Sequence, residues 1–131
     1  MKRALLTVGG VAQILAAALH VTMFFGLART TEIPAALKPL LNIFNAAVLT
    51  AVLFFAYVSF FRRRELIETP LGRAVAWFVA LFYLQRGLVE VLVSGLHPAS
   101  LGVMLTIAAL YAVSAAPSRS ARVTAFSLKA A

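Results

Sequence analysis

The chain of 131 residues contains no cysteine. This absence excludes disulfide bonds, thiol redox chemistry, iron–sulfur clusters and thiolate metal sites. Catalytic motifs are also lacking: there is no Ser–His–Asp spacing, no glycine-rich phosphate loop and no HExxH-type histidine pair. We therefore expect no metal ion and no cofactor, and the sequence leaves open whether the protein is an enzyme.

Polar residues are scarce as well. Apolar residues make up 63% of the chain, and the mean hydropathy is +0.96. A soluble domain has roughly 45–50% apolar residues, and a chain this short has too little interior to bury the excess. Because a membrane-spanning helix needs about 20 mostly apolar residues, four segments qualify, at about 5–27, 34–61, 72–94 and 99–116. The sequence predicts an all-α integral membrane protein with four transmembrane helices in an antiparallel bundle.

Acidic residues are few, since four of them stand against twelve lysines and arginines, for a net charge of +8. If the four segments alternate across the membrane, only Arg29 and Lys38 lie in the connections on one side. An excess of basic residues marks the cytoplasmic side, so both termini are expected there. The placement argues against binding of nucleic acid. The nine basic residues on the cytoplasmic side are Lys2, Arg3, Arg62, Arg63, Arg64, Arg73, Arg119, Arg122 and Lys129.

The transmembrane domain is expected to cover residues 1–117, followed by a basic cytoplasmic tail over residues 118–131. The first segment, with its basic start and the small residues 26–28, also resembles a cleavable signal peptide. Its apolar run is longer than a usual signal sequence, and Gln13 and His20 interrupt it. We therefore favour a first helix that is retained.

Prolines and glycines mark the expected helix ends. Pro34 is expected in the first turn of the second helix, where proline is tolerated. Thr69 and Pro70 suit the cap and the first position of the third helix, and Gly95 is expected to end it. Pro98 is expected to open the fourth helix. The arginine-rich run between the second and third helices is expected to be a solvated loop that sets topology and attracts anionic lipid.

Arg86 and Glu90 lie four residues apart inside the third apolar segment. A charge at the centre of a membrane helix costs about 2.5–3.5 kcal/mol on insertion scales, and such residues often mark function. One interpretation is an ion pair within the helix that fixes packing. The other is a functional site, and the order of Arg before Glu, the weaker one for such a pair, means that the pair is not optimised for packing alone. Both interpretations stay open.

Polar side chains gather in the outer half of the expected helices. With a rise of 1.5 Å per residue, His20 lies roughly 10 Å, Asn42 roughly 12 Å and Asn45 roughly 16 Å below the outer boundary. Arg86 lies roughly 12 Å and Glu90 roughly 6 Å below it. Polar and small residues recur at spacings of three and four, which favours faces turned inward. We predict one polar pocket open to the outer side, with ligand-binding residues His20, Asn42, Asn45, Tyr83, Arg86 and Glu90.

His20 allows several interpretations. It is a candidate for a proton relay, a ligand contact or an axial haem ligand, or for a structural histidine bonded to Asn42, Asn45 or Glu90. We favour the structural role. A buried haem with two histidine ligands needs them to face each other, and the only other histidine, His97, lies in an outer connection. A metal site made by His20, His97 and Glu90 lacks any short ligand spacing.

These features predict a small multi-pass protein of the bacterial inner membrane. The leading hypothesis is that the pocket binds a lipid-like or small amphiphilic anionic ligand, or a partner membrane subunit, with Arg86 contacting the anionic group. One alternative is a proton-coupled transporter, formed as a homodimer, in which Glu90 and His20 titrate. A second is a membrane-embedded enzyme that uses the same two residues. The expected partners are membrane lipids and either a second copy or a larger membrane complex.

Overall fold

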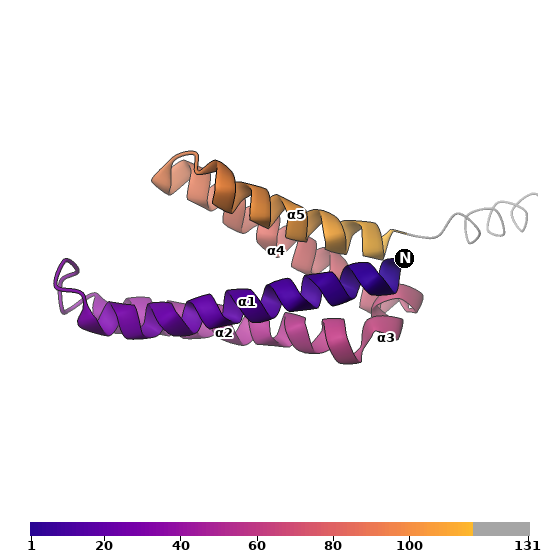
Figure 1. Ribbon diagram of the computed structural model, residues 1–131, viewed down its shortest axis with the longest axis horizontal. Helices are drawn as coiled ribbons and strands as arrows, with labels where there is room; N and C mark the ends of the chain where they lie inside the picture. Colours follow the sequence, from indigo (N-terminus) through magenta and orange to yellow (C-terminus); the bar gives the residue numbers. More distant parts are fainter. Residues whose placement is uncertain (117–131) are drawn as a thin grey trace, which may run out of the picture. The chain divides into compact units, whose positions relative to one another are not determined.

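The computed structural model describes residues 1–116, and the predicted tail at 118–131 lies outside the described residues. The described chain is helical, without strands (Figure 1). Four of its helices are long and apolar enough to cross a membrane, as the sequence predicts. A short helix, α3, lies between the second and the third of them. The elements in order are α1 (Lys2–Arg29), α2 (Lys38–Phe61), α3 (Arg63–Glu68), α4 (Pro70–Ser94) and α5 (Pro98–Ala115).

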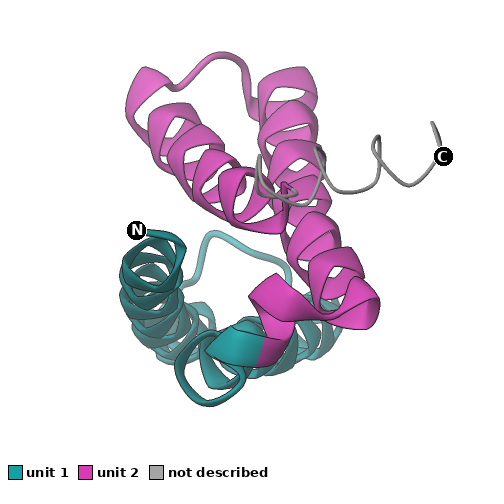
Figure 2. Cartoon of the chain, turned by 90° about the vertical axis from the view of Figure 1, so that its right-hand side faces the viewer, with its two compact units in different colours: residues 1–64 teal, residues 65–131 magenta. Residues whose placement is uncertain are grey.

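The chain divides into two compact units, residues 1–64 and 65–131 (Figure 2). In the first unit α1 packs along α2, and in the second α4 packs along α5. Short connections reverse the chain between the helices of each pair, so each pair runs antiparallel. We call these two units the N-terminal hairpin and the C-terminal hairpin.

Small residues allow close packing in the N-terminal hairpin. Gly9, Gly10 and Ala17 on α1 are buried, and a Cβ atom at Gly10 would lie 3.0 Å from the Phe60 ring of α2. Gln13, on the same face, is 0% exposed. Close approach through small residues is how helices gain contact area where no hydrophobic force drives association in lipid. The buried face of α1 is therefore the one that carries its small residues and Gln13, in line with the predicted inward-turned faces of polar and small residues.

A lysine closes the connection between α1 and α2. Lys38, the first residue of α2, donates from Nζ to the backbone oxygens of Thr30 at 2.7 Å and of Ala28 at 3.4 Å. The last carbonyls of a helix have no partner within the helix, and a cation near them is favourable. The two helix ends are thereby tied together.

The predicted start of the second helix at Pro34 is wrong, because α2 begins at Lys38. Pro34 instead accepts a turn hydrogen bond from Leu37 N at 2.9 Å. The reason is Pro39, which stands in the first turn of α2. In a helix that began at Pro34, Pro39 would be an interior residue, where it removes a hydrogen bond and clashes with the preceding turn.

The ends of α4 and the start of α5 follow the prediction. Thr69 is the N-cap of α4, and its hydroxyl accepts from Gly72 N at 2.9 Å, with Pro70 in the first turn. Gly95 follows α4 with φ of 81°, a backbone conformation that suits glycine. Pro98 begins α5. Local capping chemistry therefore sets these three boundaries.

The expected loop between the second and third spans contains a helix that the sequence analysis missed. Helix α3 has six residues, and its Leu66 is buried. The start of α4 lies against it so closely that a Cβ atom at Gly72 would stand 1.9 Å from the backbone oxygen of Glu65. A helix this short is marginal by itself, so its packing on α4 stabilises it.

Because of this contact, the addition of a single methyl group at Gly72 should destabilise the fold. Gly72→Ala should lower the free energy of unfolding by about 1–3 kcal/mol, because the new Cβ meets backbone atoms that cannot rotate away. The matched control is Gly102→Ala in α5, where nothing lies within 4 Å of a Cβ atom. Thermal unfolding in detergent, followed by circular dichroism, measures both. Equal unfolding midpoints for the two variants would contradict the packing of α3 on α4.

Candidate functional site

His20 and Asn45 form a double hydrogen bond between α1 and α2. Asn45 Nδ2 donates to the backbone oxygen of His20 at 2.8 Å, and Asn45 Oδ1 lies 2.6 Å from His20 Nδ1. The backbone oxygen can only accept, which orients the amide, and Oδ1 can only accept as well. His20 Nδ1 therefore carries the proton. His20 is a cross-link of the hairpin, in agreement with the structural role that the sequence favours.

Asn42 shares a face of α2 with Asn45 but makes no such bond. Its Oδ1 is buried, and no donor among residues 1–116 reaches it. An acceptor buried without a partner costs about 1–3 kcal/mol. The side-chain oxygen of Asn42 therefore has no hydrogen-bond partner among residues 1–116, although it lies only one helical turn from the His20–Asn45 pair.

The later start of α2 changes the depth of its two asparagines. Counted from Lys38, Asn42 lies roughly 6 Å and Asn45 roughly 10 Å along the helix axis. The sequence-based values, counted from Pro34, assume about one more helical turn before the asparagines than α2 has. Asn45 comes to the level that was predicted for His20, which is consistent with their hydrogen bonds.

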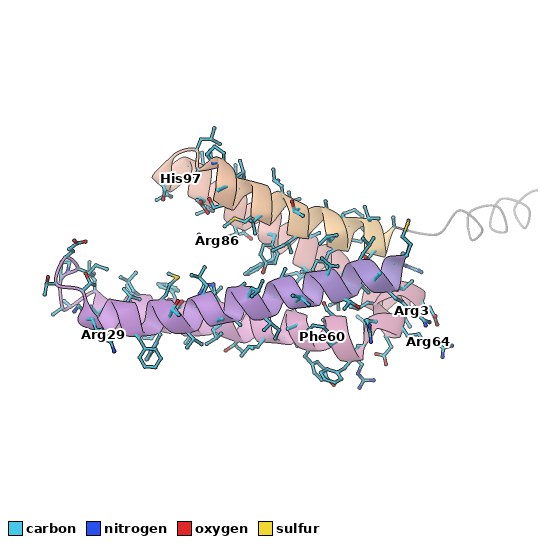
Figure 3. All side chains as sticks on the ribbon, in the orientation of Figure 1. Arg3, Arg29, Phe60, Arg64, Arg86 and His97 are labelled. Carbon is cyan, nitrogen blue, oxygen red and sulfur yellow. The ribbon has the colours of Figure 1, made fainter. Side chains whose placement is uncertain are left out.

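Arg86 is exposed on α4, in the half of the helix that leads to the connection with His97 (Figure 3). Within the described residues, its side chain forms no hydrogen bond and no ion pair, and Glu90 is not its partner. The interpretation as a self-neutralising ion pair within the helix therefore finds no support. A guanidinium stays charged in proteins, so Arg86 brings an unbalanced positive charge into an apolar helix.

Glu90 bonds to the neighbouring helix instead. Ser100 Oγ on α5 donates to Glu90 Oε1, and it also lies 3.1 Å from the backbone oxygen of His97. Sequence reasoning missed Ser100, although a serine in the first turn after Pro98 is close in register to the end of α4. The C-terminal hairpin thus has a polar cross-link of its own. Tyr83, the remaining candidate on α4, is buried beside the ring of Phe82.

The six predicted site residues fall into two sets. His20, Asn42 and Asn45 lie on facing helices of the N-terminal hairpin, and the other three share α4 in the C-terminal hairpin. The single pocket that joins all six stays a prediction.

The described residues hold no group of three or more His, Cys, Asp or Glu side chains suited to a metal ion. Comparisons with protein-family models, with curated proteins and with solved structures found no match to this chain.

The cross-link between α1 and α2 predicts a difference between two neighbouring asparagines. Asn45→Ala should lower the free energy of unfolding by about 1–2 kcal/mol, since interhelical hydrogen bonds in membranes average about 0.6 kcal/mol and reach about 1.7. Asn42→Ala is the matched control and should not lower the free energy of unfolding, because it removes a buried acceptor that has no partner to lose. Unfolding in mixed micelles gives both values.

A double-mutant cycle with His20→Ala checks the pairing itself. The double variant should be less destabilised than the sum of the two single variants, because both remove the same contact. Additive effects would show that His20 and Asn45 act independently, against the geometry described.

Proposed function

We propose that this is a small multi-pass protein of the bacterial inner membrane, with both termini in the cytoplasm, that binds the acidic group of a lipid-like amphiphile through Arg86. Four helices of spanning length support the membrane location. The orientation follows from the basic residues, nine of which fall on one side of the alternating spans and two on the other.

The observation that carries the proposal is the unbalanced charge of Arg86. The only acidic residue on α4, Glu90, is engaged by Ser100, and no other described side chain pairs with the guanidinium. An intramembrane charge without a partner is costly, and a bound carboxylate or phosphate removes much of that cost through paired N–H···O bonds. The acidic group is therefore expected to come from another molecule.

The surroundings of Arg86 favour an amphiphile. Residues three or four positions away on α4 are Phe82, Tyr83, Val89 and Glu90. Tyr83 is buried and Glu90 bonds to Ser100, and Val93 continues the exposed apolar face beyond Val89. Val89 and Val93 are exposed. A ligand that reaches Arg86 must therefore lie along apolar side chains on both sides of the guanidinium. An acidic group attached to an apolar body meets both requirements.

Proton-coupled transport and catalysis receive less support. Both alternatives need His20 and Glu90 as titrating groups, yet each of these side chains is held in a hydrogen bond between helices. Each of the two side chains thus has a structural role that requires no change of protonation. Binding through Arg86 leaves both cross-links intact.

Co-purification tests the proposal. The wild-type protein, isolated from its native membrane in mild detergent, should retain an acidic amphiphile that lipid mass spectrometry identifies. Arg86→Gln should reduce the retained amount about tenfold or more, since a hydrogen bond to a charged group contributes about 1.5–3 kcal/mol. Arg73→Gln is the matched control, because it removes the same charge at the beginning of α4, and it should retain the ligand.

Two outcomes would overturn the proposal. The first is full retention of the amphiphile by an Arg86→Gln variant whose helical content and unfolding midpoint equal those of the wild type. The second is co-purification of a membrane protein, in place of an amphiphile, that is lost on Arg86→Gln. In that case the acidic group would belong to a partner subunit.

A further inference from the structure

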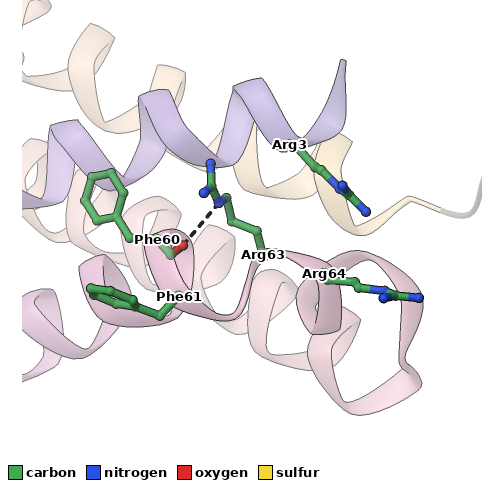
Figure 4. Close-up of a pocket in the computed structure, with 5 residues that line it drawn as sticks. All are labelled: Arg3, Phe60, Phe61, Arg63 and Arg64. Atoms are coloured by element: carbon green, nitrogen blue, oxygen red, sulfur yellow. Dashed lines mark hydrogen bonds between the residues drawn. The ribbon is translucent and has the colours of Figure 1, made fainter.

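A basic pocket lies in the N-terminal hairpin, at the end where α1 begins and α2 finishes (Figure 4). Its volume is about 480 Å³, and it is lined by Arg3, Phe60, Phe61, Arg63 and Arg64. Three arginines and two aromatic rings thus surround one space. None of the residues near Arg86 takes part in it.

Arg63 is held in place by two hydrogen bonds. Its Nε donates to the backbone oxygen of Phe60 at 3.1 Å, and its Nη1 donates to Thr7 Oγ1 on α1 at 2.9 Å. Thr7 Oγ1 in turn donates to the backbone oxygen of Arg3 at 3.0 Å. The guanidinium is therefore oriented before any ligand arrives, and the same threonine joins it to the turn of α1 that carries Arg3.

Two hydrogen bonds do not exhaust the donors of Arg63. A guanidinium has five N–H groups, and among residues 1–116 only Phe60 and Thr7 receive a hydrogen bond from this one. The remaining N–H groups are available to an anion. The first turn of α1 adds the partial positive charge of a helix N-terminus at the same end of the hairpin. The carboxylates of α3, Glu65 and Glu68, do not line the pocket.

We propose that this pocket binds the phosphate of an anionic phospholipid headgroup. Arginine forks match phosphate oxygens in geometry as well as charge, and a pocket of this volume is in the range of small-molecule sites. The lipid, as the source of the phosphate, is favoured by the two phenylalanines. They end an apolar helix of spanning length, where aromatic side chains meet the interface and lipid phosphates stand.

The site is separate from the one proposed at Arg86. It is at the cytoplasmic end of the spans if the termini are cytoplasmic, in the leaflet whose anionic lipids attract basic residues. Since Arg86 does not line this pocket, either site can fail its test without affecting the other.

Lipid titration of the full chain in nanodiscs tests the site. Phosphatidylglycerol, added to discs of phosphatidylcholine, should raise the unfolding midpoint of the wild type. Arg63→Gln should weaken the apparent affinity for phosphatidylglycerol, read from this titration, about fivefold. This is the loss expected for one basic residue at a membrane surface. Arg73→Gln removes an equal charge outside the pocket and should respond like the wild type. Circular dichroism without phosphatidylglycerol shows whether each variant is folded.

Two further variants distinguish a specific binding site from general attraction of anionic lipid by the basic residues. Thr7→Val keeps every charge and nearly the same shape but removes the group that orients Arg63, and it should weaken the response to phosphatidylglycerol. Arg63→Lys keeps the charge but loses the planar fork, and it should weaken the response as well. These variants also keep the test decisive if Arg63→Gln does not fold.

Three results would overturn the proposal. Equal losses for Arg63→Gln and Arg73→Gln would show that total charge, not the pocket, attracts the lipid. If Thr7→Val and Arg63→Lys respond to phosphatidylglycerol like the wild type, total charge and not the pocket attracts the lipid. Stabilisation by inorganic phosphate, in discs of phosphatidylcholine, equal to that by phosphatidylglycerol would identify free phosphate as the ligand.

Discussion

A polar side chain inside a membrane-spanning helix has no water to bond, so it must find a partner in a neighbouring helix or in another molecule. Both hairpins obey this constraint. His20 pairs with Asn45 across the first hairpin, and Glu90 pairs with Ser100 across the second. Hydroxyl groups that lack such partners bond to their own helix, as Thr106 does to the backbone oxygen of Gly102 at 2.7 Å. Arg86 and the side-chain oxygen of Asn42 are exceptions among residues 1–116, and of the two only Arg86 is charged.

The same constraint explains how each hairpin is held together. Lipid supplies no hydrophobic force between helices, so close packing and a few polar bonds must join them. Gly9, Gly10 and Ala17 allow α1 to lie against α2, and the His20–Asn45 pair fixes the level at which the two helices meet. Lys38 closes one end of the hairpin by donating hydrogen bonds to backbone oxygens at the end of α1. Arg63 closes the other end through Thr7.

Much of this fold can be predicted from the sequence, because bilayer thickness sets the length of each apolar run. The ends of α4 were predicted correctly since Thr69 and Gly95 act locally. The start of α2 differs from the prediction because Pro39 is tolerated only in the first turn of a helix, which places that turn at Lys38. Helix α3 was missed for another reason: its stability comes from contact with α4 and not from its own six residues.

The sequence indicates which polar side chains are unusual in apolar helices, but not which of them pair. Composition and depth single out Arg86, Glu90 and His20 as unusual groups in apolar helices. Their partners depend on which helix lies alongside, and spacing along one helix does not contain that information. An Arg86–Glu90 pair is one of the two interpretations that the sequence leaves open, whereas in the structure Glu90 bonds to Ser100 on the adjacent helix. Arg86 therefore has no ion-pair partner among residues 1–116, and this absence favours an acidic group from another molecule.

Everything proposed depends on four helices crossing the membrane with the α1–α2 and α4–α5 connections on the outer side. Labelling of single cysteines tests this arrangement most directly, because the natural chain has no thiol to interfere. A membrane-impermeant maleimide should label Thr31→Cys and Leu96→Cys in intact spheroplasts, and should label Glu68→Cys only after permeabilisation. Labelling of Glu68→Cys in intact spheroplasts, or of only one of the other two, would contradict the four-span topology.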